Sequence, residues 1–533
     1  MSRRTTTERQ PPVADPETLR VWSSARRARD ARFDGRFFVA VRTTGIYCRP
    51  ICPARTALER NVEYYPSAAA AAAHGYIACL RCRPETAAPR AASASASERS
   101  ELVARALRLV EEGALDPVNR EAEDGGGGSC ELARRLEVSE RTLRRAFLDE
   151  LGATPAQIAT TRRLHLARQL LLGSHLRCGD VAFAAGYGSV RRFNAAVRRT
   201  FGLSPARLRE KLREQEPVDA APRIRLALGY RPPLAWSLLL DFLAARAVPT
   251  IERVDPRQGV YRRWIEIGDR EGLLTVHDDA ARHRLRVELR LEPADGPAGA
   301  RRGASSTLPS LVPLTHRLRE LFDLAADPSV LEQCFADDPE LGPRWQAAPG
   351  IRVPGCFDPF ELVVRAVLGQ QVTVRGATTL AGRLVERYGR PAAAADWRLF
   401  PSPQRLRGAR LEQIGLPAAR AECLRAGAAA RADGGGFDSL RSAADNLERL
   451  LALPGIGPWT AHYVAMRALH DPDAFPDGDL VLRQVLCDGE RPWSARQVRE
   501  RAEAWRPARA YAAMLLWQVG FPDQRPTARR SKR

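Results

Sequence analysis

The chain has 533 residues, with 83 basic against 63 acidic side chains, a net charge of +20 and a pI near 10.3. This excess of positive charge predicts a nucleic-acid partner, which the motifs described below specify as double-stranded DNA. The length predicts several domains, because single hydrophobic cores stop growing at roughly 250–300 residues. There is no apolar run of membrane-spanning length and no apolar segment behind the first residues. We therefore expect no membrane partner and no export, and predict a cytoplasmic, nucleoid-associated protein.

The positive charge is almost entirely arginine. Lys211 and Lys532 are the only lysines, so phosphate contacts are expected from arginine forks, which also suit bidentate contact with guanine. Part of this bias is typical of proteins encoded by GC-rich DNA, but the sign of the charge is independent of it.

Four cysteines near the N-terminus form two short pairs. Three residues separate the first pair, two separate the second, and twenty-six lie between the pairs. Cysteines at this spacing, in turns rich in Pro and Arg, direct sulfur toward sulfur and suit a tetrahedral zinc ion. The alternative is a set of buried, reduced thiols. We predict one Zn²⁺, held by Cys48, Cys52, Cys79 and Cys82.

The residues around these cysteines resemble the N-terminal domain of the bacterial adaptive-response (Ada) protein, over roughly residues 16–86. The segments 38–50 and 79–84 carry the resemblance. It implies a small α+β zinc domain, here 1–86, in which the thiolate of Cys48 irreversibly accepts a methyl group from a methylphosphotriester in DNA. It also implies backbone contacts with DNA from Arg42, Thr44 and Arg55.

The residues alone are consistent with nucleophilic chemistry at such a site. Zinc keeps sulfur as thiolate at neutral pH, and the thiolate is the nucleophilic form. Four thiolates around Zn²⁺ carry a net charge of −2, and a neutral thioether at Cys48 leaves −1. Methylation would therefore weaken repulsion from DNA phosphates, which predicts that alkylation damage switches DNA binding on.

A linker of small residues at 87–100 precedes two similar units at 131–147 and 180–194. In each unit a short helix and a turn are followed by Ser139 or Ser189, which we expect to cap an arginine-rich helix. This pattern favours helix-turn-helix units, whose second helix lies in the major groove.

With the segment 201–205, these units resemble the AraC-type DNA-binding domain, two helix-turn-helix units joined by a long helix, here about 159–172. The resemblance implies a transcription activator at 101–215, with RNA polymerase as a further expected partner. Residues 125–128, four glycines, are expected to be an inserted flexible loop. The candidate contacts with DNA, each of which could instead be a solvated surface residue, are Arg141, Arg144, Arg145, Arg191 and Arg192.

Beyond Pro217 the pattern changes to runs of strand length around a helix at 234–246. This predicts a small antiparallel α+β domain at 220–302, followed by a helical domain at 303–525. The expected fold class is therefore multidomain and mainly α. The expected strands are 224–228, 260–267, 273–276 and 285–291.

Residues 220–520 resemble bacterial 3-methyladenine DNA glycosylase II (AlkA) along their length, including 236–237, 242–248 and 369–372. Such an enzyme flips a nucleotide out of the duplex, stabilises an oxocarbenium-like sugar and replaces the base by water.

The segment 453–457 reads Leu-Pro-Gly-Ile-Gly and predicts a tight turn between two helices. The bare N–H groups of Gly455 and Gly457 can approach a DNA phosphate. Thr460 is expected to cap the following helix and to contribute to DNA binding. The alternative is an ordinary glycine-rich helix connection.

Asp479 lies twenty residues after Trp459. A hairpin of this kind followed by an Asp at this distance resembles the helix-hairpin-helix DNA glycosylases, in which the Asp is essential. As a catalytic carboxylate, Asp479 could stabilise the sugar cation or orient or deprotonate the water, and the sequence leaves both roles open. The alternative for a lone Asp beside a Gly is a helix N-cap.

Aromatic rings can recognise a cationic alkylated base by stacking and cation–π attraction. The AlkA resemblance places Trp517 at the base-binding tryptophan and brings Tyr463 near it, while Trp459 is either part of this group or helix core. Gln371 stands where the relative has a wedge leucine that fills the gap left by the flipped base.

Two variants of the glycosylase chemistry are disfavoured. Enzymes that also cut the strand have a lysine in the hairpin, where this chain has Trp459, and no other lysine is near in sequence. Only Cys487 follows Asp479, so no iron–sulfur cluster is expected. The Pro-Cys-His-Arg motif of O6-methylguanine methyltransferases is also absent.

The sequence thus predicts a fused alkylation-damage response protein. One half is a regulator that senses methylphosphotriesters, and the other is a DNA glycosylase that hydrolyses the N-glycosidic bonds of alkylated bases of the 3-methyladenine type, without lyase activity. The alternative is a methylation-activated regulator whose glycosylase half is degenerate.

Overall fold

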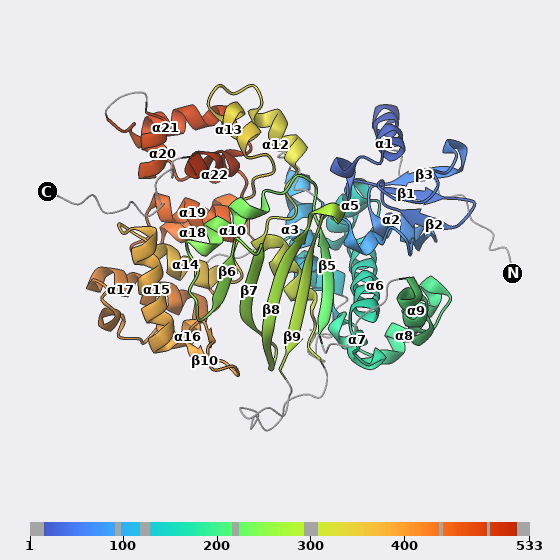
Figure 1. Ribbon diagram of the computed structural model, residues 1–533, viewed down its shortest axis with the longest axis horizontal. Helices are drawn as coiled ribbons and strands as arrows, with labels where there is room; N and C mark the ends of the chain where they lie inside the picture. The colour runs from blue at the N-terminus through green and yellow to red at the C-terminus, as the bar shows by residue number, and fades with distance from the viewer. Residues whose placement is uncertain are drawn as a thin grey trace. The chain divides into compact units, whose positions relative to one another are not determined.

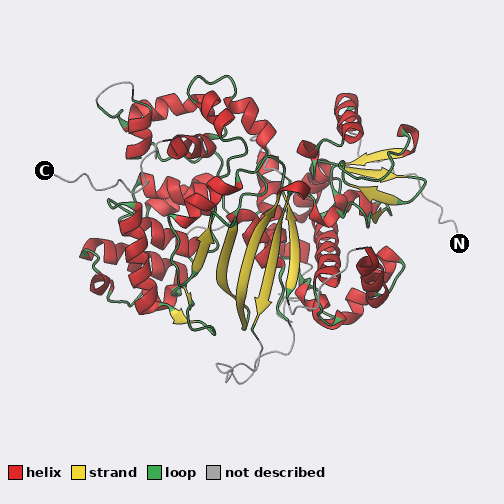
Figure 2. Ribbon diagram, viewed as in Figure 1, coloured by secondary structure: helices red, strands yellow, loops and turns green. Residues whose placement is uncertain are grey.

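The computed structural model describes residues 15–90, 98–117, 128–215, 223–292, 308–435, 441–487 and 491–519. The chain separates into two compact units, one of residues 1–231 and 264–319 and the other of residues 232–263 and 320–533. Helices predominate (Figures 1 and 2), which confirms the expected multidomain, mainly helical class. Within the described ranges, none of the helices has the length and apolarity needed to cross a membrane. The domain limits given above stay predictions.

The N-terminal part of the first unit is built on a four-stranded sheet of order β3-β1-β2-β4. β2 (Ile46–Cys48) pairs with β4 (Ile77–Ala78) in parallel, with Tyr47 opposite Ala78. The two strands therefore end side by side at the two cysteine pairs. The other elements are α1 (Pro16–Ala28), β1 (Phe38–Val41), β3 (Val62–Tyr65), α2 (Ala68–Ala73) and the 3-10 helices η1 (Ala31–Phe33), η2 (Glu59–Asn61) and η3 (Pro84–Thr86).

Two helix-turn-helix units follow, and their capping residues are as predicted. Ser139 Oγ accepts from the Thr142 amide at 3.0 Å and Ser189 Oγ from the Arg192 amide at 3.3 Å. The expected loop at 125–128 lies outside the described residues apart from Gly128. The helices are α3 (Glu98–Glu112), α4 (Gly128–Arg135), α5 (Glu140–Leu151), α6 (Pro155–Gly173), α7 (Cys178–Ala184), α8 (Val190–Phe201) and α9 (Pro205–Gln215).

The long helix α6 begins earlier than expected from the sequence. Thr154 and Gln157 form a capping box, and Pro155 occupies the first helical position, where its missing N–H costs nothing. These start signals precede the apolar run on which the prediction of 159–172 was based.

A five-stranded sheet of order β5-β9-β8-β7-β6 follows, with antiparallel pairing of β5 with β9, β8 with β9 and β6 with β7. The division between the units falls within this sheet, since β5, β8 and β9 belong to the first unit and β6 to the second. β6 was not predicted, because its sequence Glu-Arg-Val-Asp shows no apolar alternation. The strands are β5 (Ile224–Gly229), β6 (Glu252–Asp255), β7 (Val260–Ile267), β8 (Arg270–Asp279) and β9 (Arg284–Leu291), with η5 at Ala280–Arg282.

The second unit is otherwise helical around one large apolar core that includes the fully buried Trp505. A short ribbon of β10 (Arg390–Pro391) and β11 (Arg398–Leu399) lies among the helices. One helix, α11 (Val312–Leu321), crosses the division between the units. The helices of the second unit are α10 (Trp236–Ala244), α12 (Pro328–Phe335), α13 (Leu341–Ala347), α14 (Pro359–Leu368), α15 (Val374–Tyr388), α16 (Pro403–Leu406), η6 (Leu411–Ile414), α17 (Ala418–Ala432), α18 (Ala443–Leu451), α19 (Pro458–Ala468), α20 (Leu480–Val485), α21 (Ala495–Ala502), η7 (Glu503–Trp505) and α22 (Arg509–Val519).

A buried ionic cluster joins the β6–β7 pair to α14 within the second unit. The Arg263 guanidinium pairs with Glu252 at 3.3 Å and with Glu361, and Arg365 pairs with Glu252 at 2.9 Å. Tyr261 donates to the same Glu252 carboxylate at 2.7 Å. Two cations and two anions balance in this cluster, which is the condition under which burial of charge is tolerated.

Replacement of Arg263 by methionine should destabilise the second unit by about 3–5 kcal/mol, because it leaves two carboxylates sharing one buried guanidinium. Denaturant unfolding would measure this change. Arg262→Met, at the next position of β7, is the matched control and should change the free energy of unfolding by less than about 1 kcal/mol. Equal effects of the two substitutions would contradict the role given to the cluster.

Candidate functional site

A hairpin between α18 and α19 lies next to the candidate site in the second unit. Gly455 has a φ of +80°, and a β-carbon there would lie 3.0 Å from the Cys423 side chain, so only glycine suits this position. Gly457 is the N-cap of α19 and open space surrounds the position of its missing β-carbon. The exposed tip therefore presents bare backbone at a helix N-terminus, which is an arrangement that suits a phosphate.

The prediction that Thr460 caps α19 is wrong. The N-cap is Gly457, and Thr460 lies in the first turn of the helix, where it is buried. Its hydroxyl oxygen accepts a hydrogen bond from Gln370 at 3.1 Å. Pro458 accounts for the difference, since its fixed φ starts the helix three residues earlier than a Thr460 cap would.

Asp479 is both a helix cap and the centre of a hydrogen-bond cluster. Its Oδ1 atom accepts from the amides of Val481 and Leu482, at 3.0 and 3.1 Å, at the start of α20. Trp517 Nε1 donates to Oδ1 at 3.1 Å, and Trp459 Nε1 donates to Oδ2 at 2.9 Å. The N-cap alternative is therefore realised, together with two indole contacts that an ordinary cap does not have. Four N–H donors match an acceptor-only carboxylate.

Three rings form an aromatic cluster beside this carboxylate. Trp459 and Tyr463 lie four residues apart on α19 and stack, with ring centroids 5.1 Å apart and planes at 10°. The Trp517 ring of α22 is 6.3 Å from Tyr463 at 57°. The structure thus brings together the four residues Trp459, Tyr463, Asp479 and Trp517 from three helices.

Two arginines that the sequence did not single out surround the phenol of Tyr463. Arg467 donates to the Tyr463 hydroxyl at 2.6 Å and to the carbonyls of Pro354 and Gly355 at 2.7 and 2.9 Å. Arg246 also bonds to Tyr463 and lies over the Phe242 ring at 3.6 Å. Burial acts to raise the pKa of Tyr463, but the charges of Arg467 and Arg246 outweigh it and lower that pKa. Arg467 lies one helical turn from Tyr463, so the sequence spacing could have predicted their contact, whereas Arg246 is distant in sequence.

Gln371 lies in the turn between α14 and α15, close to the hairpin in space. Its side chain is exposed and its φ is +57°, an uncommon conformation for a residue other than glycine. The preceding Gln370 donates to the Gly455 carbonyl at 2.9 Å as well as to Thr460. Gln370 therefore fixes the turn that presents Gln371 to the hairpin, a role the sequence alone did not reveal.

The first unit holds a second candidate site, the cluster of Cys48, Cys52, Cys79 and Cys82. Their sulfur atoms all lie within 4.8 Å of one another. A tetrahedral zinc site with Zn–S bonds of about 2.3 Å needs sulfur atoms about 3.8 Å apart, so the cluster fits this ion. Arg49, next to Cys48, is buried and pairs with Asp34 at 2.5 Å, which holds the loop in place.

The thiols of this cluster also need a cation to ionise together. Hydrogen bonds between them lower the pKa of Cys52 to about 7 and lower that of Cys79, while they raise the pKa values of Cys48 and Cys82. Charge on one sulfur opposes charge on the next. A divalent cation among the four sulfurs removes this conflict, which supports a metal site.

The predicted DNA contacts of the first unit all lie at the surface. Arg42, Thr44 and Arg55 are exposed near the cysteine cluster, and Arg42 donates to the Arg60 carbonyl. Exposure is required for a role in DNA binding but does not test it, so these roles stay predictions. The same holds for the exposed arginines of α5 and α8, which are Arg141, Arg144, Arg145, Arg191 and Arg192.

The fold and the two sites define a fusion of a metal-binding DNA-reading half with a DNA-repair half. Comparison with known families agrees. The metal binding domain of Ada matches residues 22–85, a helix-turn-helix domain matches 132–211 and the AlkA N-terminal domain matches 225–358.

Relatives cover the whole arrangement. The chain is 39% identical over 500 residues to a probable bifunctional transcriptional activator/DNA repair enzyme AlkA of Mycobacterium tuberculosis, covering 92% of this chain and 94% of the relative. It is 36% identical over 295 residues to DNA-3-methyladenine glycosylase 2 of Escherichia coli, covering 54% and 95%. It is 41% identical over 128 residues to the bifunctional transcriptional activator/DNA repair enzyme Ada of the same organism, covering 24% and 31%. The chain belongs to the family of AlkA-type bifunctional transcriptional activator/DNA repair enzymes, which confirms the predicted Ada and AlkA resemblances.

Replacement of Gln370 by alanine should weaken binding to a duplex that contains an abasic-site analogue by about 5- to 30-fold. It removes two hydrogen bonds that hold the turn against the hairpin, each contributing about 0.5–1.5 kcal/mol. Fluorescence anisotropy would measure the affinity. Gln413→Ala, at an exposed glutamine of η6 in the same unit whose side chain accepts from Arg387, is the control. Unchanged affinity in the Gln370 variant would contradict this role.

Proposed function

We propose that the second unit is a monofunctional DNA glycosylase that hydrolyses the N-glycosidic bond of alkylated bases of the 3-methyladenine type. The single observation that carries this proposal is the Asp479 carboxylate, held by two indoles beside the hairpin. The name of the E. coli relative, a DNA-3-methyladenine glycosylase, supports the substrate class.

The hydrogen bonds of Asp479 indicate which of its oxygens acts. Oδ1 accepts from two amides and one indole, whereas Oδ2 accepts from Trp459 alone. Each carboxylate oxygen has about two lone-pair sites, so Oδ1 is fully engaged and the lone pair that can meet a ligand lies on Oδ2. We assign to Oδ2 the contact with the sugar or the attacking water. Breaking the bond to C1′ sends its electron pair to the cationic base. Water then adds at C1′, and the proton that it loses passes to Oδ2 or to solvent.

The aromatic cluster suits the recognition of such a base. Trp459, Tyr463 and Trp517 offer π-faces, and a cationic purine gains about 0.5–2 kcal/mol per cation–π contact. Gln371 is our candidate for the wedge, since it is exposed on a turn that Gln370 fixes to the hairpin. Gly455 and Gly457 are the candidate phosphate contacts.

Hydrolysis without strand cleavage follows from the residues available. A lyase forms a Schiff base with a lysine amine, and the chain has only Lys211 and Lys532. Trp459 occupies the hairpin position of that lysine, and its indole is engaged with Asp479. One cysteine, Cys487, follows Asp479, and a four-cysteine iron–sulfur cluster is not part of the proposal.

Asp479→Asn should lower the release of 3-methyladenine from alkylated DNA by about 10²-fold or more, because it removes the negative charge but keeps the shape of the side chain. Chromatography of the released base would measure this. Asp477→Asn, two residues earlier and paired with Arg499 rather than with the indoles, is the control and should retain activity. Equal release by wild type and Asp479→Asn would refute the catalytic role, and no release by either would favour a regulator with a degenerate glycosylase half.

We propose that the first unit senses methylphosphotriesters by accepting a methyl group on Cys48. Of the four cysteines, Cys79 and Cys82 are buried, which leaves Cys48 and Cys52 accessible. Backbone amides donate to the other three sulfurs, from Arg49 to Cys82 at 3.3 Å, from Ala54 to Cys52 and from Cys82 to Cys79. Such bonds withdraw electron density from a thiolate, so we expect Cys48 to be the strongest nucleophile.

The transfer is a substitution at carbon. The Cys48 sulfur forms a bond to the methyl carbon while the bond from that carbon to the phosphate oxygen breaks, and the electron pair leaves as a phosphodiester anion. One Zn²⁺, held by all four sulfurs, would keep them as thiolates. Arg42, Thr44 and Arg55 are exposed nearby and are the candidate contacts with the DNA backbone. Methylation lowers the negative charge of the site by one, which favours promoter DNA and activation together with RNA polymerase.

A duplex that carries one methylphosphotriester should transfer its methyl group to the Cys48 peptide of the zinc-loaded protein, as read by mass spectrometry. Cys48→Ser should abolish the transfer, since a serine hydroxyl is not ionised at neutral pH. Cys130→Ser, which changes an exposed cysteine outside the cluster, should leave it intact. Methylation of another cysteine in the wild-type protein would contradict the assignment of Cys48.

A further inference from the structure

Helix α6, which joins the two helix-turn-helix units, also contacts the domain that carries the cysteine cluster. Its neighbours include α2 and η3 of that domain, α3, α7 and α9 of the DNA-reading domain, and β5. Twelve of its nineteen residues are buried. A helix with so many neighbours is a structural link between the two domains rather than a surface spacer.

Two side chains of α6, three residues apart and so on one face, reach the strands that carry the cysteines. A ring nitrogen of His165 lies 2.8 Å from the hydroxyl of Tyr47, the residue before Cys48. Arg168 donates to the carbonyl of Cys79 at 3.0 Å and to that of Ala78 at 3.2 Å. Each of the two cysteine-bearing strands therefore has one contact with the same helix.

These two contacts act on a connected pair of strands. Tyr47 in β2 and Ala78 in β4 are partners, and the Cys79 amide donates to the Tyr47 carbonyl at 2.9 Å. The ends of β2 and β4 are therefore joined to each other, and both strands contact α6.

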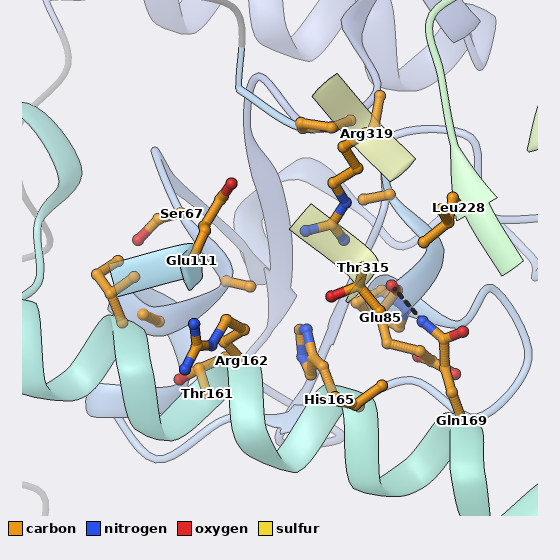
Figure 3. A pocket seen from close by; sticks show the side chains of 18 of the residues that line it. Ser67, Glu85, Glu111, Thr161, Arg162, His165, Gln169, Leu228, Thr315 and Arg319 are labelled. Atoms are coloured by element: carbon orange, nitrogen blue, oxygen red, sulfur yellow. Dashed lines mark hydrogen bonds between the residues drawn. The ribbon is translucent and has the colours of Figure 1, made fainter. Parts of the chain in front are cut away.

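The attachment of α6 to the cysteine domain is strong. Arg168 is 1% exposed and forms an ion pair with the equally buried Glu85, while Gln169 donates to the Glu85 carbonyl at 3.1 Å (Figure 3). Just before α6, Ser67 Oγ donates to the carbonyl of Leu151, the last residue of α5, at 2.7 Å, and Ala153 belongs to the apolar core of the cysteine domain.

The far end of α6 is tied equally firmly to the second helix-turn-helix unit. Arg209 of α9 donates to the Leu171 carbonyl at 3.2 Å and to the Leu176 carbonyl at 2.6 Å. Arg213 donates to the Ser174 carbonyl at 2.7 Å. These bonds fix the end of α6 and the segment that leads into α7, and so the position of α7 and α8.

We propose that His165 and Arg168 are positioning residues of the methyl-acceptor site, and that through them α6 transmits methylation of Cys48 to the second helix-turn-helix unit. This inference rests on the proposed methyl transfer to Cys48. The proposed route is mechanical and acts in addition to the change of charge. The change of charge acts where DNA meets the acceptor site, whereas α6 leads to the helices α7 and α8.

The surroundings of α6 leave space for such a movement. A cavity of about 180 Å³ borders the helix on this side, and Figure 3 shows Arg162, His165 and Arg319 among the residues that line it. Burial lowers the pKa of His165 to about 4, so the imidazole is neutral and movement into the cavity carries no charge with it. Packed cores shift between discrete arrangements, and a cavity supplies the volume for one.

The test uses the full-length, zinc-loaded protein, with a synthetic duplex that carries one methylphosphotriester as methyl donor. Two variants, Tyr47→Phe and His165→Phe, each remove the hydrogen bond between β2 and α6 while they keep an aromatic ring. Loss of one hydrogen bond should slow methyl transfer in a single turnover by about 3- to 10-fold. The double variant should be no slower than either single variant, since all three lack the same contact.

The second readout is hydrogen–deuterium exchange of peptides from residues 178–201, which form α7 and α8, before and after complete methylation. In the wild type, methylation should change their exchange rates by about 3-fold or more, and in either variant this change should fall by at least half although Cys48 is methylated. Thr160→Ala, on the exposed face of α6, is the matched control and should behave as wild type. Arg168→Lys, which keeps a charge opposite Glu85 but lacks the fork, provides a second variant with the same expected loss.

Unchanged exchange at 178–201 in methylated wild-type protein would overturn the inference while leaving methyl transfer intact. A full response in both phenylalanine variants and in Arg168→Lys would also overturn it. Absence of a methyl group on Cys48 of the wild type would instead refute the proposed methyl transfer, and the inference with it.

Discussion

Buried guanidinium groups hold this molecule together. Seven arginines of the described residues are less than a tenth exposed, and each meets carboxylates or backbone carbonyls from distant parts of the sequence. Arg49 holds the cysteine loop against Asp34, Arg263 joins β7 to α14, and Arg467 joins α19 to the segment before α14. A buried cation is tolerated only when it is paired, and the planar fork of arginine can satisfy several acceptors at once. The seven are Arg26, Arg49, Arg168, Arg231, Arg263, Arg352 and Arg467.

The features that the sequence predicted correctly depend on signals that are local in the chain. The cysteine spacing predicted the cluster because four ligands in two short turns have few other arrangements, and Ser139 and Ser189 were found as caps because capping is local. Asp479 was found through its distance from Trp459, and the strands at 224–228 and 260–267 through their apolar runs. In each case the signal lay within a few residues or within a known spacing.

The contacts that sequence reasoning missed are those between distant segments. An arginine on the surface and an arginine in an ion pair look alike in a sequence, so nothing marked Arg168 or Arg246 as different from Arg141. Gln370 is conspicuous only once the hairpin is next to it. The cap of α19 was misassigned because Pro458 starts the helix before Thr460. β6 has no apolar alternation, since its Glu252 faces the ionic cluster instead of the apolar core.

Both sites place a reactive group where a strand ends or a helix begins, and in both N–H groups donate to acceptor atoms of the site. At Asp479 three donors meet Oδ1 and one meets Oδ2, whereas at the cysteine cluster the Arg49 amide donates to the Cys82 sulfur. The two chemistries differ in one respect that makes their fusion useful. In the functions proposed above, a thioether at Cys48 is permanent, so each molecule records one methylation, while the carboxylate of Asp479 is regenerated in every turnover. Methylating agents act on phosphates and on bases together. A sensor that counts the first kind of damage therefore reports how much of the second kind the same chain has to remove.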